Sequence, residues 1–292
     1  MASPRLLAEN LKTRIFFKRL ANSNYDPTKL RARIERGCPV AESTRLDLTH
    51  GHLEEWGSSV SDTSLLYIPG GGFCFGPNSD HRDFITDIGN CLEARRFLLN
   101  YRLAPEHPYP AALEDTEEAL DTVATAGNRL VLLADSAGAA LALAALMRLR
   151  DRGNSIPVAC AVYLSAYTDL AHTGLSHITN SGRDPMFGVE ALIHKAHHYL
   201  QGHNPTDASA SPYWGDASGL PPSLFFVGST EVMYDDSARM VQRGKAAGCD
   251  FRLRVYGMAP HDFPLNAKLS EAKRARSEIV DFIRQQLAPT KS

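Results

Sequence analysis

One serine of the 292-residue chain stands where a nucleophile would be expected. Ser136 follows the apolar run 130–134, and a stretch of Ala, Leu and Met with helical spacing follows it directly. Small residues, Ala134 and Gly138, lie two positions before and after it, as a sharp strand-to-helix turn requires. The pattern predicts a nucleophilic serine. A serine that only caps a buried helix after a strand has the same spacing, so that interpretation stays open at this point.

Three consecutive glycines, 70–72, follow another apolar run. Glycine has no Cβ, so the backbone N–H groups of such a loop can approach a ligand closely. In an acyl-transfer reaction the N–H groups of these glycines and of Ala137 would stabilise the oxyanion of the tetrahedral intermediate. A flexible turn would use the same glycines.

A histidine and several acidic residues follow the last two apolar runs. His261 comes after the run 251–256, and the segment 228–236 before it contains one Glu and two Asp. The chain order serine, acid, histidine is that of the α/β-hydrolase triad. In such a triad His261 takes the serine proton, while the acid fixes the tautomer of the imidazole. Asp262 adjoins His261, but because it is the next residue along the backbone we discount it as the triad acid.

Composition limits the partners and the compartment. Lys and Arg number 31 against 33 Asp and Glu, so nothing favours nucleic acid as a partner. No apolar run approaches the roughly 20 residues of a membrane span, so we expect no stable membrane insertion. The five cysteines are scattered and odd in number, which favours reduced thiols and a cytoplasmic location. His194 and His198 have metal-ligand spacing without a third ligand, so we expect no metal, and a homodimer is left open.

Alternating strands and helices predict an α/β fold with a mainly parallel central sheet and helices on both faces. A hairpin over 45–56 is expected at one edge of the sheet, and the alternating run 251–256 at an edge as well. The strands are expected at 64–68, 96–101, 130–133, 158–164, 223–227 and 251–256, and the helices at 80–94, 110–126, 137–149, 237–247 and 270–287.

Two segments fall outside this alternation. Residues 1–43 are expected to form N-terminal cap helices, and residues 44–292 the hydrolase core, with a cap insertion at about 180–205. We expect one apolar face of the first helix to pack against the protein, although a helix lying on a membrane surface would share its pattern. That face comprises Leu6, Leu7, Leu11, Ile15 and Phe16.

Several motifs in order give the sequence a resemblance to a known family. The longest is 101–115, Tyr-Arg-Leu-Ala-Pro-Glu-His-Pro-Tyr-Pro-Ala-Ala-Leu-Glu-Asp, and shorter ones lie at 165–170, 184–186, 211–212 and 219–222. From about Leu65 to Phe263 the chain resembles the hormone-sensitive-lipase-like (family IV) esterases of the α/β-hydrolase superfamily.

The resemblance implies roles for particular residues. Ser136 is similar to the family's nucleophile and His261 to its base, while Gly71, Gly72 and Ala137 resemble the oxyanion donors. Glu231 stands where the family pattern has its acid, usually an aspartate, and Asp235 is the alternative assignment. The chain departs from the family at Pro69, which replaces the histidine before the glycines, and at Ala139-Ala140, which replaces Gly-Asn.

The implied function is that of a serine carboxylesterase. It would hydrolyse short- to medium-chain esters of small molecules through an acyl-enzyme, without a cofactor. Two alternatives remain. One is a non-catalytic receptor for a small ligand, which His261 argues against and Pro69 leaves open. The other is an amidase or formamidase that uses the same triad.

Overall fold

The computed structural model describes residues 2–16, 18–21, 23, 26–34, 43–57, 61–124, 129–154 and 156–288. The strands are β1 (Thr44–Asp47), β2 (His52–Trp56), β3 (Thr63–Ile68), β4 (Arg95–Asn100), β5 (Arg129–Asp135), β6 (Val158–Leu164), β7 (Ser223–Gly228) and β8 (Phe251–Tyr256). The helices are α1 (Pro4–Phe16), α2 (Lys18–Ala21), α3 (Pro27–Ile34), α4 (Ser79–Leu92), α5 (Ala111–Ala124), α6 (Ser136–Asp151), α7 (Ser176–Thr179), α8 (Val189–Leu200), α9 (Tyr234–Ala246) and α10 (Ser270–Leu287), with 3-10 turns at Pro212–Trp214 and Phe263–Leu265.

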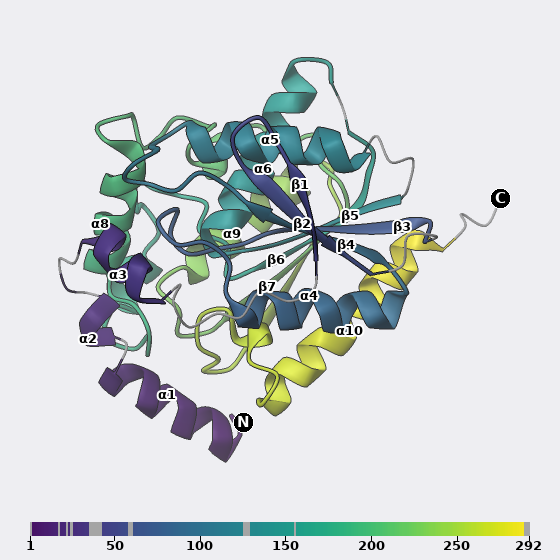
Figure 1. Ribbon diagram of the computed structural model, residues 1–292. Coiled ribbons are helices and arrows are strands. Elements are labelled where there is room, and N and C mark those ends of the chain that lie inside the picture. The colour runs from purple at the N-terminus through teal and green to yellow at the C-terminus, as the bar shows by residue number, and fades with distance from the viewer. Residues whose placement is uncertain are drawn as a thin grey trace.

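All the strands join one twisted sheet in the order β1-β2-β4-β3-β5-β6-β7-β8 (Figure 1). β1 pairs antiparallel with β2, and β2 pairs antiparallel with β4, whereas the pairs from β4 to β8 are parallel. The predicted α/β class, the edge hairpin and the edge position of the last strand are therefore confirmed.

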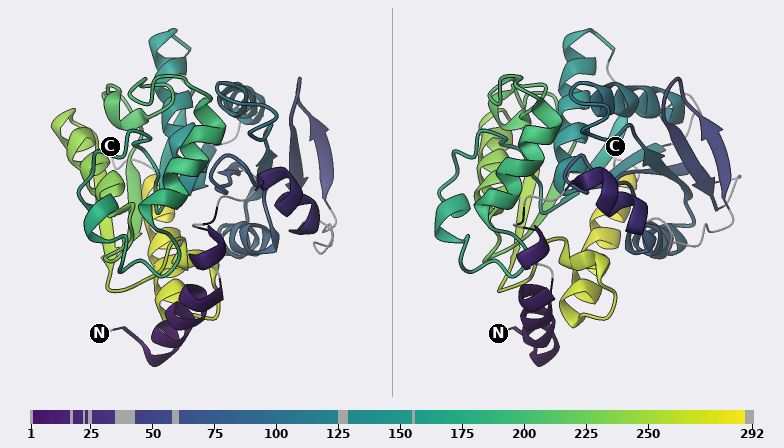
Figure 2. Two further views of the ribbon diagram at one scale, coloured as in Figure 1. Left: turned by 90° about the vertical axis from the view of Figure 1, so that its left-hand side faces the viewer. Right: turned by 60° about the vertical axis from the view of Figure 1, so that its left-hand side comes forward.

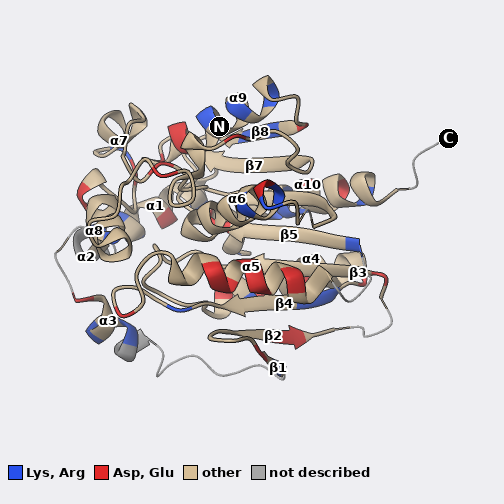
Figure 3. Cartoon of the chain, turned by 90° about the horizontal axis from the view of Figure 1, so that it is seen from above, with Lys and Arg blue, Asp and Glu red and all other residues tan. Residues whose placement is uncertain are grey.

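The sheet is covered on both faces because its central strands are apolar on both sides. β3 shows the division: Leu66 and Ile68 belong to the core under α5, α6 and α9, and Leu65 and Tyr67 to the core over α4 and α10. Figure 1 shows α5 and α6 on one side of the sheet and α4 and α10 on the other. In Figure 3 acidic residues, in red, mark α5, whereas β7, whose sequence is Ser-Leu-Phe-Phe-Val-Gly, carries no charged residue.

The N-terminal helices lie beside the segment 180–205 at one end of the sheet (Figure 2). The Arg14 guanidinium of α1 donates a hydrogen bond to the Gly182 carbonyl at 2.9 Å. The expected burial of the apolar face of α1 is confirmed for Leu6 and wrong for its other described side chains. Leu7, Leu11 and Ile15 are 45%, 60% and 58% exposed, because only the Leu6 position of this stripe meets the core. The side chain of Phe16 lies outside the described ones, as do residues 35–42 of the predicted N-terminal segment.

The topology brings the candidate site residues to one edge. Because β3, β5, β7 and β8 run in the same direction, the loops that follow them gather at the carboxyl end of the sheet. These loops contain the glycines, Ser136, the acidic segment and His261. α8, within the segment 180–205, lies over the same end (Figure 1).

Candidate active site

Ser136 occupies a strained turn between β5 and α6. Its φ angle is +49°, and its side chain is at the first residue of the helix. A non-glycine residue in this region costs about 1–3 kcal/mol, which the surrounding structure must supply. The tight crossing of α6 over β3 explains the small residue at 138, because a Cβ built on Gly138 would lie 2.2 Å from the Ile68 carbonyl oxygen.

Hydrogen bonds with Tyr101 and Asp135 hold the glycine loop that follows β3. Gly71 and Gly72 have φ angles of +110° and +60°, which favour glycine. The Tyr101 hydroxyl lies 3.0 Å from the Pro69 carbonyl oxygen and 3.1 Å from that of Gly70. The Gly70 N–H donates to the buried Asp135 carboxylate at 2.8 Å. The Tyr101 hydroxyl thus fixes the loop at the position where Pro69 replaces the family's histidine.

A cavity of about 900 Å³ opens at this edge of the sheet. Gly71, Gly72, Ser136 and His261 line it together. Ala137, the remaining predicted oxyanion donor, is fully buried as the second residue of α6. Apolar side chains make up another part of the wall, among them Phe75, Met186, Phe187 and Leu192. The cavity can therefore hold an apolar group beside the serine.

The Glu231 carboxylate is fully buried and reaches His261. Its Oε2 lies 2.9 Å from His261 Nδ1, and its Oε1 accepts hydrogen bonds from the Gly228 N–H and from the Ser165 hydroxyl, the latter at 2.9 Å. These bonds fix the carboxylate, which in turn fixes the plane of the imidazole.

The other ring nitrogen of His261 faces Asp262. Its Nε2 lies 2.9 Å from Asp262 Oδ2, and no hydrogen bond between described residues joins it to the Ser136 hydroxyl. Burial alone would lower the pKa of His261, but the Asp262 and Glu231 carboxylates raise it well above its usual value. Burial raises the pKa of Asp262 to about 7, against the opposing effect of His261. The structure therefore brings Ser136 and His261 to one cavity, with a carboxylate on each nitrogen of the imidazole.

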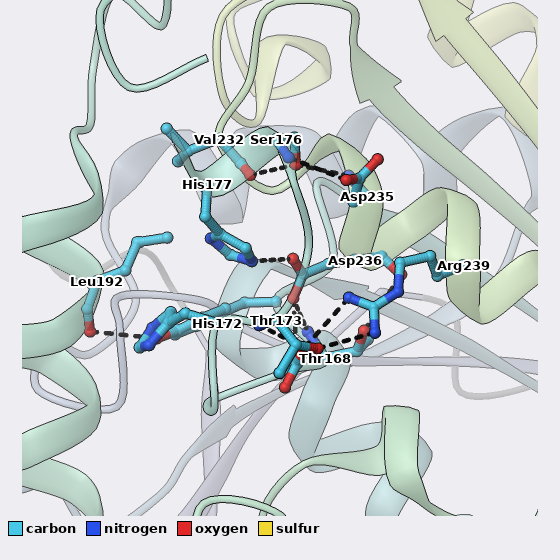
Figure 4. A network of polar contacts seen from close by, with 12 residues as sticks. Thr168, His172, Thr173, Ser176, His177, Leu192, Val232, Asp235, Asp236 and Arg239 are labelled. Atoms are coloured by element: carbon cyan, nitrogen blue, oxygen red, sulfur yellow. Dashed lines mark hydrogen bonds and ion pairs between the residues drawn. The ribbon is translucent and has the colours of Figure 1, made fainter. Parts of the chain in front are cut away.

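Asp235 lies away from His261, in a separate polar network (Figure 4). Its carboxylate accepts the Ser176 N–H at 2.9 Å and so joins the start of α9 to α7. In the same network His177 Nε2 lies 2.7 Å from Asp236 Oδ2, and both side chains are fully buried. This network connects the loop after β6 with α9, and it does not reach the imidazole of His261.

The sequence did not predict the contacts of three residues at the site, Tyr101, Ser165 and Asp262. Ser165 supports Glu231 and also accepts the Asp262 N–H at 3.0 Å, and Tyr101 fixes the glycine loop. The position of Ser165 directly after β6, which pairs with β5 just before Ser136, was a usable signal. The contact of Asp262 with His261 had no signal in the sequence. It depends on a left-handed backbone, φ +51°, that an aspartate seldom adopts.

No group of three or more His, Cys, Asp or Glu side chains that could hold a metal ion occurs in the described ranges. Within the same part of the chain, no helix has both the length and the apolar character needed to cross a membrane.

Comparisons with known proteins identify the relatives of this chain. Residues 65–265 match the family described as having the alpha/beta hydrolase fold. An acetyl-hydrolase of Streptomyces hygroscopicus is 42% identical over 188 residues, which are 63% of this chain and 62% of the relative, so the chain matches less than two thirds of that protein. An esterase of Acinetobacter venetianus is 32% identical over 271 residues, 89% of each chain.

Solved structures agree over nearly the whole length. An esterase from the bacterial hormone-sensitive lipase family is 34% identical, with a TM-score of 0.88 over 99% of this chain and 100% of that one. EstE5, in a crystal soaked by p-nitrophenyl butyrate, is 30% identical, with a TM-score of 0.89 over 98% of this chain and 99% of that one.

The fold and the relatives together show that this chain is a carboxylic ester hydrolase. The chain belongs to the α/β hydrolase family and, within it, to the hormone-sensitive-lipase-like esterases. The alternative of a non-catalytic receptor is set aside on these findings.

Proposed function

We propose that the chain is a serine carboxylesterase that works through an acyl-enzyme, with Ser136 as nucleophile, His261 as base and Glu231 as the orienting acid. The Ser136 oxygen bonds to the ester carbonyl carbon as its proton passes to His261 Nε2. The tetrahedral intermediate then breaks its bond to the alcohol oxygen, which receives the proton from His261. Water, deprotonated by the same nitrogen, attacks the acyl-enzyme, and Ser136 regains its proton as the acid leaves.

The oxyanion of each intermediate binds to the N–H groups of Gly71, Gly72 and Ala137. These groups belong to the loop after β3 and to the first turn of α6, whose dipole also favours negative charge. In this proposal the Asp262 carboxylate turns away from Nε2 when substrate enters, so that Nε2 faces the Ser136 hydroxyl.

One observation carries the proposal. The buried Glu231 carboxylate lies 2.9 Å from His261 Nδ1, and the same imidazole lines the cavity that contains the strained Ser136. The volume and apolar wall of this cavity support acyl chains of short to medium length. The p-nitrophenyl butyrate used with EstE5 is an ester of that kind.

We also propose a cytoplasmic location. The described cysteines, Cys74, Cys91, Cys160 and Cys249, form no disulfide, as expected for a reducing compartment.

A fluorophosphonate probe and a panel of p-nitrophenyl esters test the nucleophile. We expect the probe to label Ser136 covalently and the Ser136→Ala variant to lose both labelling and hydrolysis. Matching p-nitroanilides, run beside the esters, separate an esterase from an amidase. Labelling that persists in Ser136→Ala would contradict the assignment.

Paired variants test the acid. Glu231→Gln keeps the shape of the side chain but removes the charge that holds His261, so we expect kcat to fall roughly 10³–10⁴-fold. Asp235→Asn is the matched control, because Asp235 bonds to Ser176 instead of His261. A larger loss in Asp235→Asn than in Glu231→Gln would overturn the assignment.

A further inference from the structure

The Asp262 side chain lies close to the place where the alcohol of an ester would leave. Its Oδ2 is 2.9 Å from His261 Nε2, and in the proposed mechanism that nitrogen returns its proton to the alcohol oxygen. Asp262 and His261 line the same cavity, and the Asp262 side chain is 14% exposed. The carboxylate and the alcohol oxygen each lie one hydrogen bond, about 3 Å, from Nε2, so at most about 6 Å separates them.

The contact between Asp262 and His261 requires a proton on Nε2. His261 Nδ1 faces the Glu231 carboxylate at 2.9 Å, so a neutral imidazole keeps its one proton on Nδ1 and presents a lone pair at Nε2. A carboxylate oxygen also offers only lone pairs, and two acceptors repel each other at this distance. Asp262 therefore loses this partner in the form of the enzyme that can accept the serine proton.

Besides His261, no residue that the structure describes donates a hydrogen bond to the Asp262 carboxylate. Its Oδ1 is buried and has no hydrogen-bond partner within the described ranges. The backbone, in contrast, is fixed, because the Asp262 N–H donates to the Ser165 hydroxyl at 3.0 Å and the buried Phe263 follows. The carboxylate can thus turn on a fixed backbone by breaking the contact with Nε2.

A buried carboxylate without a donor is costly, and its neighbours add to that cost. Burial raises the pKa of Asp262, and the Asp135 and Glu231 carboxylates raise it further. The opposing effect of His261 is lost once the imidazole is neutral. A donor that enters the cavity with the substrate would replace the imidazole as the partner of Asp262 and draw the carboxylate away from Nε2.

We propose that Asp262 determines specificity by accepting a hydrogen bond from a hydroxyl or ammonium group on the alcohol part of the ester, close to the ester oxygen. That hydrogen bond holds the Asp262 carboxylate away from His261 Nε2, which then faces the Ser136 hydroxyl. The proposal rests on the proposed esterase function and names the substrate class of the same site: esters of diols or of amino alcohols.

Two ester pairs test it, one for each kind of donor. 2-Hydroxyethyl acetate and propyl acetate differ in a terminal hydroxyl or methyl on the alcohol side. 2-(Dimethylamino)ethyl acetate, protonated at neutral pH, and 3-methylbutyl acetate differ in an N–H or a C–H group at one position. The readout is the ratio of kcat/KM for the ester with the donor to that for its partner, at neutral pH and after subtraction of the uncatalysed rate. An effect of a variant on the base itself is common to both esters and cancels in this ratio.

The variants are chosen to keep the backbone at position 262. Its φ angle is +51°, a region that glycine and asparagine adopt more readily than most residues. In Asp262→Gly, which removes the acceptor, we expect the ratio to fall about tenfold to a hundredfold for at least one pair, the loss typical of a hydrogen bond to a charged group. Asp262→Asn keeps an uncharged acceptor and should retain more of the ratio for the hydroxyl pair than for the ammonium pair. Asp80→Asn, at an exposed carboxylate of the same cavity, should leave both ratios as in the parent.

The outcomes are distinct. A lower ratio in Asp262→Gly supports the proposal, and the pair that shows it tells whether the donor is a hydroxyl or an ammonium. Ratios that Asp262→Gly leaves unchanged for both pairs would show that water is a sufficient partner for the carboxylate, and would overturn the role of Asp262. Failure of the parent protein to hydrolyse any of the four esters would instead overturn the proposed function.

Discussion

At the scale of single residues, His261 is defined by the two carboxylates beside it. In the proposed triad, Glu231 on Nδ1 orients His261, whereas Asp262 occupies the nitrogen that would accept the serine proton. The positions of Ser136 and His261 after their strands could be predicted from spacing alone. The choice between Glu231 and Asp235 required the family pattern, and the Asp262 contact depends on a backbone angle that no residue type at that position signals.

This arrangement predicts how activity depends on pH. The Asp262 carboxylate stabilises the protonated imidazole and raises the pKa of His261. His261 must be neutral to act as a base, so kcat/KM falls as pH drops through that raised pKa. In Asp262→Asn the pKa of His261 decreases, and we expect the acid limb of the pH profile to move to lower pH by roughly 1–2 units.

The profile of kcat/KM against pH for a neutral ester checks this shift. Asp80→Asn is a suitable control, because Asp80 lines the same cavity but is exposed. An acid limb that stays in place in Asp262→Asn would show that Asp262 does not control the base.

At the scale of elements, apolar runs and helical spacing identified the strands of the sheet and its long helices, with ends that shift by a few residues. Such runs are informative because strands buried on both faces need unbroken apolar sequence. The packing of the N-terminal helix was harder to predict. The helix has the expected apolar stripe, but periodicity does not show whether another segment covers that stripe. Leu7, Leu11 and Ile15 remain exposed.

The crossing of α6 over β3 gives a prediction about a single methyl group. Alanine is favoured over glycine within a helix by about 1 kcal/mol. In Gly138→Ala, however, the new Cβ would lie 2.2 Å from the Ile68 carbonyl and 2.6 Å from that of Pro69, so α6 must shift. We expect a net loss of about 1–3 kcal/mol in the free energy of unfolding, together with a lower kcat.

Urea unfolding and ester hydrolysis measure the two effects. Gly182→Ala is the matched control, because a Cβ at that position meets nothing within 4 Å. If Gly138→Ala is as stable and as active as Gly182→Ala, the close crossing does not set the turn at Ser136.

At the scale of the whole molecule, the parallel sheet positions the loops that contain the site residues. Loops that are far apart in sequence meet at one edge because β3, β5, β7 and β8 share a direction, and this could be deduced from the alternation of strands and helices. The alternation of strands and helices does not predict how the segments outside the sheet attach to one another. The loop after β6 and α9 are joined by the polar network of Figure 4, whose His, Asp and Arg residues are scattered along the sequence.

The buried pair in that network should be important for stability. His177 and Asp236 are 2.7 Å apart and fully buried, and Asp236 raises the pKa of His177 although burial opposes it. In His177→Gln the fully buried Asp236 carboxyl loses its imidazole partner, and we expect the free energy of unfolding to fall by about 3–5 kcal/mol. The pair His203–Asp207, at 2.8 Å with side chains 36% and 34% exposed, offers a control, for which His203→Gln should cost no more than about 1 kcal/mol. Urea midpoints of the two variants against the parent give the comparison, and equal losses would mean that burial adds nothing to this contact.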